Sequence, residues 1–241
     1  MNKNYSFLRR PLEYDDAFIT SYSRYGESDC VVKLFTRRSG RISLFFKRGL
    51  DPKNHSALVT LSFARIGFLA SDYRMGKLYS LDADPQFLLL ASSLKIFAYS
   101  SYLAELIEKL IPEHEALEPI FNLISEAYNS LLHKGPQSSM LRALELKLLA
   151  NLGYLPEFPE AKTNYFYEPL SGYFMTNLSN TSFEVSEGAL KIAHSMLEEN
   201  LYSNFHAQKS ELMMIGRIFH SRLKVLGLWP LKSLTFFKQI K

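Results

Sequence analysis

The sequence predicts an α+β protein in which a small antiparallel β domain precedes an α-helical domain. Up to Asp84, apolar and polar residues tend to alternate in short segments between turn signals, which is the period-2 pattern of β-strands. After Pro85, apolar residues recur every three or four positions, as they do on the buried face of a helix. We therefore expect a β domain over residues 1–84 and a helical domain over residues 85–241.

Glycine-containing turn signals divide the β domain into five segments, for example at Tyr25-Gly26, Ser39-Gly40 and Met75-Gly76. The expected strands span residues 14–23, 29–36, 40–47, 58–69 and 76–82. Five short antiparallel strands suit an OB-fold β-barrel, which is a frequent platform for single-stranded nucleic acid.

The helical domain begins with a periodic run that Pro112 ends, because proline cannot continue a helix. Further helices are expected over residues 117–133, 138–152, 185–200 and 208–226. Between the third and fourth helices of the domain, residues 154–182 are rich in Pro, Asn, Tyr and Ser. This segment is expected to form a loop and a small hairpin inserted into the helical domain.

Composition limits the class of protein. Apolar residues make up 47% and charged residues 22% of the chain, as is usual for a globular protein. No run of about 18 apolar residues predicts a membrane span, and the N-terminus lacks the apolar region of a signal peptide. Cys30 is the only cysteine, which excludes an intrachain disulfide and a thiolate-rich zinc site. A reducing, cytoplasmic location is therefore expected, and no membrane partner.

Positive charge gathers at the two ends of the chain. Residues 1–84 carry a net charge of +5, residues 85–135 a net charge of −3, and residues 136–241 a net charge of +2. Clustered positive charge is typical of a protein that binds a polyanion, because neutralising phosphates releases counterions. An ordinary solvated surface explains the same charge equally well.

Two expected strands of the β domain each combine an apolar face with a face of aromatic and basic residues. In residues 29–36, Cys30, Val32 and Leu34 share one face, and Ile42, Leu44 and Phe46 share one face of the next strand. These apolar faces should form the barrel core. The opposite faces combine aromatic rings with cations, which suits stacked bases and phosphates. The candidate DNA-binding residues of this domain are Lys33, Phe35, Arg37, Arg38, Arg41, Phe45, Lys47, Arg48 and Lys53.

Two alternatives accompany these candidates. Phe35 and Phe45 either stack on bases or pack against each other as a cross-strand pair beneath the helical domain. Near the C-terminus, Arg222, Lys224 and Lys232 are candidates for a second DNA contact, which Lys238 extends. Arg222 and Lys224 are explained equally well as cations favoured by a helix C-terminus.

Enzymatic functions find little support. The six histidines lack the spacing of a metal-binding helix, and no phosphate-binding glycine loop of the Walker type occurs. Cys30 lies on an all-apolar strand face, as a buried core thiol does. We expect no enzyme activity and no cofactor. A metal-dependent nuclease using Asp15, Asp16 and Glu27 is the enzymatic alternative, and an adaptor that binds only proteins is the other.

An ordered series of short motifs resembles the RecO family of recombination mediators. The series contains Tyr25-Gly26-Glu27-Ser28-Asp29, Leu34-Phe35-Thr36, Gly40, Lys47-Arg48-Gly49, Lys53, Ala104-Glu105-Leu106, Leu152-Gly153-Tyr154-Leu155-Pro156 and Leu231-Lys232-Ser233. The resemblance implies binding of single- and double-stranded DNA, annealing of complementary strands, and a nucleoid-associated location. It also implies a RecR-type partner and help in placing the RecA recombinase on DNA coated by single-strand-binding protein.

The resemblance also implies a partner site at Arg142. The stretch Arg142-Ala143-Leu144-Glu145-Leu146 resembles the Arg-x-Phe-Glu-Leu stretch of the family, near which the acidic tail of single-strand-binding protein is thought to dock. A guanidinium beside an apolar groove suits a carboxylate next to an aromatic residue. The alternative is that Arg142 pairs with Glu145 or Glu126.

The sequence departs from the family at one feature. Many members carry two Cys-x-x-Cys pairs that form a zinc site, whereas the corresponding positions here are Ala161, Asn164, Met175 and Leu178. We expect a zinc-free hairpin held by an aromatic cluster. The candidate members of that cluster are Tyr165, Phe166, Tyr167, Tyr173 and Phe174.

Overall fold

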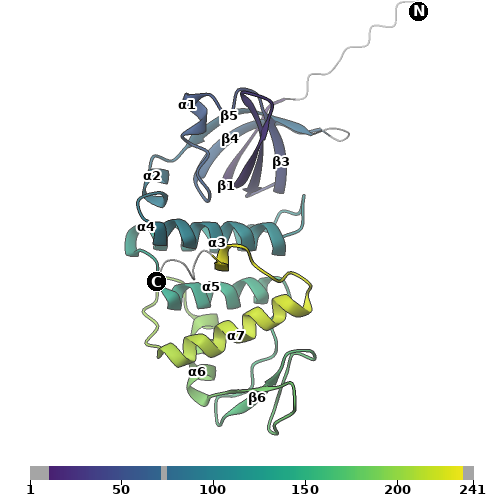
Figure 1. The fold of residues 1–241 in the computed structure, drawn as a ribbon, viewed down its shortest axis with the longest axis vertical. Helices are drawn as coiled ribbons and strands as arrows, with labels where there is room; N and C mark the ends of the chain where they lie inside the picture. Colours follow the sequence, from purple (N-terminus) through teal and green to yellow (C-terminus); the bar gives the residue numbers. More distant parts are fainter. Residues whose placement is uncertain (1–10, 72–74, 236–241) are drawn as a thin grey trace, which may run out of the picture. The chain divides into compact units, whose positions relative to one another are not determined.

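The computed structural model describes residues 11–71 and 75–235, except the side chain of Phe87, and it confirms the expected α+β class (Figure 1). The strands are β1 (Glu13–Tyr25), β2 (Asp29–Thr36), β3 (Gly40–Phe46), β4 (Phe63–Leu69), β5 (Gly76–Ala83), β6 (Tyr165–Glu168), β7 (Tyr173–Met175) and β8 (Phe183–Val185). The helices are α1 (Pro52–His55), α2 (Phe87–Leu90), α3 (Leu94–Leu110), α4 (Glu118–Lys134), α5 (Ser138–Asn151), α6 (Glu187–Glu198) and α7 (Lys209–Val225).

The first five strands close into a barrel in the order β1-β2-β3-β5-β4 (Figure 1). All neighbours are antiparallel except β3 and β5, which are parallel. The period-2 faces expected from the sequence point inward, so the alternation of apolar and polar residues produces the core. Core residues from the two strands analysed above are Cys30, Val32, Leu34, Ile42, Leu44 and Phe46.

One strand boundary was predicted wrongly. The segment 58–69 was expected to be a single strand, but β4 begins at Phe63 and the short helix α1 was not expected. The reason is a register shift in β1 between Ile19 and Ser21. At this irregularity the Ile19 N–H donates to the Ser62 carbonyl, and the Leu61 N–H donates to the Ile19 carbonyl. Residues 58–62 therefore close the barrel with irregular backbone.

The chain divides into two compact units, each described by itself. The barrel unit contains the described residues up to Ser93 together with Leu103–Leu117. The helical unit contains Leu94–Tyr102 and the described residues from Glu118 onward. Helix α3 therefore contributes residues to both units. None of the helices within the described ranges is long and apolar enough to cross a membrane.

In the helical unit, α4, α5, α6 and α7 begin and end within two residues of the predicted positions. Helix α5 lies at the centre, because it contacts α4, α6 and α7. Its buried residues explain this position, since Met140, Leu144 and Leu148 are accompanied by five further buried side chains around the helix. A helix that is apolar around most of its circumference is buried on most sides.

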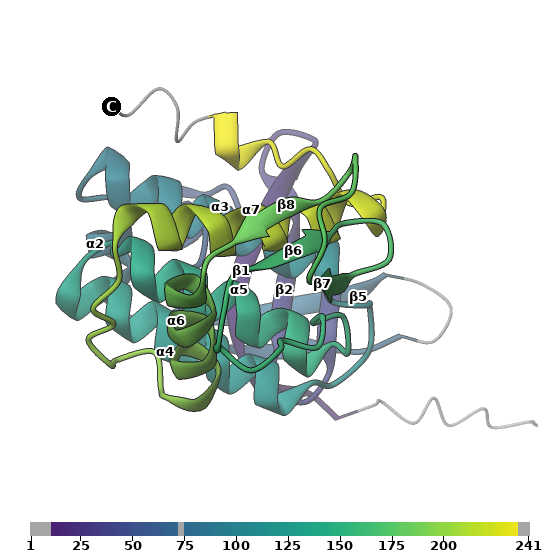
Figure 2. The same ribbon diagram turned by 90° about the horizontal axis from the view of Figure 1, so that it is seen from below.

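The expected hairpin is present as β6 and β7, and β8 adds a third strand that was not predicted. This small sheet packs on α6 and α7 (Figure 2). The packing core contains Tyr167, Phe183, Val185, Ala189, Leu190 and Ile218, with Tyr165 and Phe174 beside it. Three of the five candidate aromatic residues therefore join the cluster, whereas Tyr173 is 67% exposed.

A carboxylate also holds the loops of this small sheet. Glu168 Oε2 accepts hydrogen bonds from Ser179 Oγ at 2.9 Å and Thr181 Oγ1 at 2.5 Å, and Glu168 Oε1 accepts one from the Leu170 N–H at 3.3 Å. The pKa of Glu168 is lowered, mainly by the hydrogen bond from Thr181. Desolvation acts in the opposite direction, and the hydrogen bonds from Ser179 and Leu170 lower the pKa further. The aromatic cluster and this carboxylate together account for the order of the segment that was expected to be a zinc-free hairpin.

We expect the purified protein to contain no stoichiometric zinc and to keep its melting temperature when a strong chelator is added. The physical reason is that Ala161, Asn164, Met175 and Leu178 offer no thiolate, and within residues 11–71 and 75–235 no three His, Cys, Asp or Glu side chains gather as metal ligands do. Elemental analysis and thermal unfolding with and without chelator check this. One tightly bound zinc per chain would contradict it.

Candidate nucleic-acid interface

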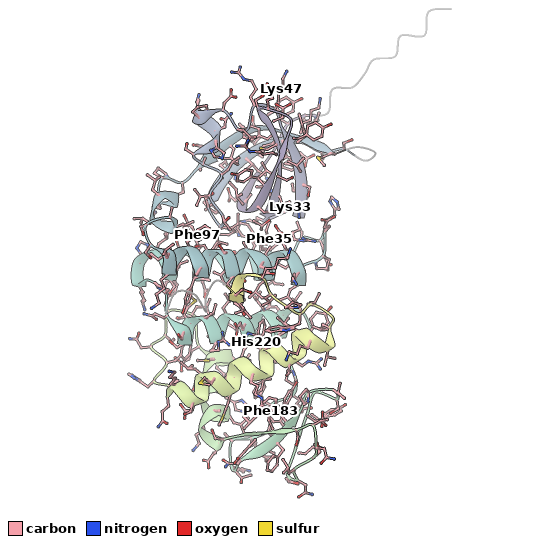
Figure 3. All side chains as sticks on the ribbon, viewed as in Figure 1. Lys33, Phe35, Lys47, Phe97, Phe183 and His220 are labelled. Carbon is pink, nitrogen blue, oxygen red and sulfur yellow. The ribbon has the colours of Figure 1, made fainter. Side chains whose placement is uncertain are left out.

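The candidate cations of the barrel unit lie at two ends of the barrel. In Figure 3, Lys33 and Phe35 lie near one end and Lys47 lies at the opposite end. The β2–β3 turn carries Arg37 and Arg38 at the first end. The two ends differ in how strongly their cations are neutralised.

Acidic partners neutralise the cations around the β2–β3 turn. The nitrogen–oxygen distances are 3.8 Å from Arg37 to Asp16 and 3.6 Å from Arg38 to Asp15. Asp16 also pairs with Arg65 at 2.8 Å. Asp15 and Asp16, the candidate acids of a nuclease, therefore serve as partners of arginines. Arg37 and Arg38 are less available to phosphates than their sequence suggested.

Arg41 is held in a similar way. Its guanidinium lies 3.6 Å from a Glu113 oxygen, and its side chain is only 17% exposed. The strand itself is tied to the same segment, because the His114 N–H donates to the Arg41 carbonyl. Gly40 adopts a φ of +69°, and a Cβ at this position would lie 2.2 Å from the Glu115 carbonyl oxygen. Only glycine allows this approach of the turn to residues 113–115.

Phe35 is fully buried, so it is not open to a base. Its cross-strand partners are Phe18 and Arg41, and Phe18 is in turn paired with Phe63. The Phe18 and Phe63 rings meet edge to face at 5.3 Å. The assignment of Phe35 as a stacking residue is therefore corrected to a packing role. The expected pair of Phe35 and Phe45 is also wrong, because the register places Arg41 opposite Phe35.

Lys33 is half-exposed but has an acidic partner on α3. Its Nζ lies 3.5 Å from Glu108 Oε2, and Ser21 Oγ donates to Glu108 Oε1 at 2.6 Å. Burial raises the pKa of Glu108, but hydrogen bonds from Ser21 and Thr20 and the charge of Lys33 outweigh burial and leave the pKa lowered. The contact places the second half of α3 over the outer face of β1 and β2.

The opposite end of the barrel carries exposed cations beside aromatic rings. We call Tyr25, Phe45, Lys47, Lys53 and Lys77 the barrel-end surface. The Tyr25 and Phe45 rings meet edge to face at 5.6 Å, and Lys77 lies opposite Phe45 in the parallel β3–β5 pair. Lys47, Lys53 and Lys77 are exposed, and none has an ion pair within the part of the chain that the structure describes.

Two neighbours define the edge of this surface. Helix α1, which carries Lys53, is tied to β1 by the hydrogen bond of 2.9 Å between Tyr22 and His55. Arg48 is exposed, but its Nε donates to Asp51 at 2.7 Å, so its charge is partly neutralised. Of the DNA-binding cations expected from the sequence, Lys47 and Lys53 are therefore the ones that remain available to phosphates at this end of the barrel.

Tyr25 and Lys77 were missed by sequence reasoning. Tyr25 is 64% exposed and was used as part of a turn signal and of a family motif, but not as a DNA-binding residue. Lys77 follows Gly76, and the alternation of the last barrel strand places it on the outer face. Only the parallel pairing of β3 with β5 brings it beside Phe45, and that pairing joins strands that are not consecutive.

Cys30 is a buried core thiol, as the all-apolar strand face indicated. Burial, with a smaller effect of the neighbouring Asp29 charge, raises its pKa to about 11. A thiol with such a pKa is almost entirely protonated near neutral pH and is a poor nucleophile.

The C-terminal cations lie in different surroundings. Arg222 Nε donates to the Tyr154 carbonyl at 3.3 Å, and Lys224 Nζ lies 5.3 Å from the centre of the Trp229 ring. Lys232 is exposed and also takes part in a further contact. Lys238 lies outside the described residues. Arg222 therefore contacts the backbone at Tyr154, and Lys224 extends toward an aromatic ring.

Arg142 takes the alternative role considered from the sequence. Its Nη2 lies 2.8 Å from Glu145 Oε1, and only 13% of its side chain is exposed. Glu145 is fully buried and also accepts a hydrogen bond from the Tyr102 hydroxyl. Burial raises the pKa of Glu145 to about 7, although Arg142 and Tyr102 oppose that shift.

Comparison with known proteins identifies the family to which this architecture corresponds. The family model described as Recombination protein O N terminal matches residues 12–84, and the one described as Recombination protein O C terminal matches residues 91–234. The chain belongs to the RecO family. Members of this family are non-enzymatic recombination mediators that act in DNA repair, so the prediction that the chain is not an enzyme is confirmed.

Individual relatives agree with the family assignment. The chain is 28% identical over 225 residues to the DNA repair protein RecO of Pelotomaculum thermopropionicum, covering 88% of this chain and 84% of the relative. It is 33% identical over 144 residues to the RecO protein of Pelobacter propionicus, covering 58% of each chain. The RecO protein of Myxococcus xanthus is 30% identical over 146 residues, covering 60% of each chain.

Proposed function

We propose that this RecO protein binds single- and double-stranded DNA through the barrel-end surface and anneals complementary strands. It would also help to load a RecA-type recombinase onto DNA coated by single-strand-binding protein. Residues 1–84 would form the DNA-binding domain and residues 85–241 the partner-binding domain. The observation that carries this proposal is the contact between the exposed Tyr25 ring and the partly buried Phe45 ring. Lys77 lies opposite Phe45, Lys47 follows β3, and Lys53 lies on α1, which the Tyr22–His55 hydrogen bond ties to β1.

The chemistry of this surface suits a flexible, sequence-independent contact. A ring pair offers a stacking surface to any base, and stacking contributes about 1–3 kcal/mol per base. Lysines beside the rings meet phosphates as compact charges, without demanding a fixed geometry. A protein that releases two strands after pairing them needs such contacts, because they hold the backbone and leave base edges accessible.

Replacing Lys47, Lys53 and Lys77 together with alanine is expected to weaken DNA binding for every sequence tested. The slope of log affinity against log salt concentration should flatten by roughly one unit for each phosphate that the variant no longer binds. Fluorescence anisotropy of a labelled single strand, titrated at several salt concentrations, measures both quantities. Arg48 is left unchanged in this variant, because it is paired with Asp51.

The matched control removes the same charge from exposed positions of the helical unit, at Lys95, Lys162 and Lys191. Equal affinity and slope for the triple variant and wild type would reject the barrel-end surface. A protein-only adaptor predicts no salt-dependent binding of DNA by the wild-type chain. Incubation of DNA with magnesium or manganese tests the nuclease alternative, for which intact DNA is expected.

The remaining DNA and partner assignments belong to the same proposal. Arg222, Lys224 and Lys232 would hold a second strand, and a RecR-type mediator would bind the chain. The acidic tail of single-strand-binding protein at Arg142 also stays a prediction. Its carboxylate would have to displace Glu145 from the guanidinium, and Glu145 would then take up a proton because a buried unpaired carboxylate is unfavourable.

A further inference from the structure

The helical unit contains a cavity of about 1160 Å³ whose lining suits an anion with an apolar part. Among the described residues that line it, four are lysine or arginine and none is aspartate or glutamate, while Trp229 and several aliphatic side chains give apolar walls. In Figure 3, His220 on α7 and Phe183 on β8 mark this region. The acidic tail that the proposed function assigns to Arg142 fits this lining, because Arg142 is one of the four cations.

Glu145 binds Arg142 from outside the cavity. Its carboxylate is fully buried and does not line the cavity, yet Oε1 lies 2.8 Å from Arg142 Nη2. The same oxygen accepts a hydrogen bond from the Tyr102 hydroxyl of α3, and Oε2 makes no hydrogen bond within the described residues. The cavity therefore offers a ligand the Arg142 guanidinium, but an internal carboxylate already neutralises it.

Few groups stabilise the charge of Glu145. Among the described residues of α3, α4, α5, α6 and α7, the groups that act on this charge are Arg142 and Tyr102. On α7, burial and nearby cations lower the pKa of His220 to about 4, so its ring is neutral near pH 7 and supplies no charge. A second carboxylate brought to Arg142 would therefore leave Glu145 without a balancing charge.

The Arg142 guanidinium carries one positive charge, so it can balance either Glu145 or the carboxylate of a ligand. Burial already raises the pKa of Glu145 to about 7, although Arg142 and Tyr102 oppose that shift. A nearby like charge and the loss of an opposite charge both favour the protonated form of a buried carboxyl group. Glu145 therefore takes up a proton when another carboxylate occupies Arg142.

We propose that Glu145 is an internal competitor of the ligand at Arg142, so that an acidic peptide binds this cavity together with one proton. The inference rests on the proposed function, because it gives the tail site at Arg142 a regulation by pH. Peptide binding and protonation of Glu145 favour each other by linkage. The affinity for the peptide is highest where Glu145 is already protonated, and it falls as pH rises.

The probe is an N-acetylated acidic peptide that ends in phenylalanine, and its binding to the full-length protein is measured by isothermal titration calorimetry. The carboxylates of the peptide are ionised throughout the range from pH 6 to pH 8. Because Glu145 of the free protein titrates near pH 7, the affinity of wild type should fall about tenfold between these pH values. Titrations at pH 8 in two buffers of different ionisation enthalpy should show an uptake of about 0.9 proton per peptide.

Glu145→Gln keeps the size of the side chain and removes its charge. This variant should bind the peptide equally well at pH 6 and pH 8, and at pH 8 about tenfold more tightly than wild type. Glu199→Gln is the matched control, because Glu199 is an exposed acid of the same unit, and it should keep the wild-type pH dependence. A peptide with an amidated C-terminus should bind more weakly and without proton uptake, because it lacks the carboxylate that competes with Glu145.

The outcomes separate this inference from the proposed function. Equal peptide affinity of wild type at pH 6 and pH 8, without proton uptake, would overturn the inference and leave the tail site standing. A pH dependence that Glu145→Gln retains would also overturn it, because another group would then accept the proton. Absence of peptide binding at both pH values, with DNA binding intact, would overturn the tail assignment and the inference together. The proton uptake of wild type requires no substitution, so it tests the inference even where Glu145→Gln does not fold.

Discussion

Arg142→Ala is expected to lower the free energy of unfolding by about 3–5 kcal/mol. Arg142 is the charged partner of Glu145, whose carboxylate is fully buried, with Oε2 making no hydrogen bond within the described residues. Removing the guanidinium leaves a buried carboxylate with only the Tyr102 hydroxyl as a partner. Urea unfolding followed by circular dichroism measures the loss.

A double variant, Arg142→Met/Glu145→Met, provides the control. Replacing both members of a buried ion pair with apolar residues of similar size is often close to neutral. The double variant should therefore recover most of the stability that Arg142→Ala loses. A loss below about 1 kcal/mol for Arg142→Ala would show that the pair behaves like an exposed salt bridge.

The pH dependence of stability follows from two buried groups with opposite effects. The pKa of Glu145 rises from its ordinary value of 4.5 to about 7, so between these values the folded chain holds a proton that the unfolded chain has released. Its contribution to stability therefore falls as pH rises through this window. Burial, with the charges of Arg142 and Lys224, lowers the pKa of His220 from 6.5 to about 4, and its contribution rises with pH.

Glu145→Gln should separate the two effects. With Glu145 removed, only His220 remains, so the stability of the variant should rise more steeply than that of wild type between pH 4.5 and 6.5. The measurement is the free energy of unfolding in urea at these two pH values. Parallel pH profiles for variant and wild type would show that Glu145 does not titrate in this range.

The sequence offered two roles for Arg142: binding a partner, from the family motif, and pairing with Glu145, from helix spacing. The spacing of Arg142 and Glu145 is three residues, which places both on neighbouring positions of a helix, and their pairing was considered as the alternative to partner binding. The sequence does not show that Gly216 on α7 makes room for the guanidinium. A Cβ at Gly216 would lie 1.9 Å from an Arg142 nitrogen, so any larger residue at this position would force the guanidinium to shift.

The barrel illustrates which part of a site the strand pattern predicts. Alternation identified the inward residues of β2 and β3, because one face of each strand must be apolar to fill the core. Alternation alone does not show whether an outward face is open or covered. Lys33 and Phe35 both point outward, yet the segment of α3 around Glu108 lies over that face, and Phe35 is fully buried. Contacts with α3, which is distant in the sequence, decide whether this outward face is open or covered.

The acidic partners of the arginines were also beyond the reach of the sequence pattern. Asp15 and Asp16 lie on β1, whereas Arg37 and Arg38 lie in the β2–β3 turn. Charge counts along the chain gave the right sign for the barrel unit but did not show which cations are neutralised. The pairing register of the strands decides which cations meet an acidic side chain. It neutralises Arg37 and Arg38, and Lys47 and Lys77 remain available to phosphates.

Phe35→Ala is expected to destabilise the barrel by about 3–5 kcal/mol, as removal of a fully buried phenylalanine ring does. The missing ring leaves a cavity beside its cross-strand partner Phe18, which is itself fully buried. Phe45→Ala is the matched comparison, because Phe45 is only partly buried and its ring contacts the exposed Tyr25. Its expected stability loss is much smaller.

The two substitutions should affect DNA binding in the opposite order. At a temperature where both variants remain folded, Phe35→Ala should bind single-stranded DNA like wild type, because its ring is not accessible to bases. Phe45→Ala should bind about 5- to 100-fold more weakly, which corresponds to the loss of one stacked base. Anisotropy titrations run beside urea unfolding give both quantities for each variant. Weaker DNA binding by folded Phe35→Ala than by Phe45→Ala would place the stacking surface on the α3 side of the barrel and reject the barrel-end surface.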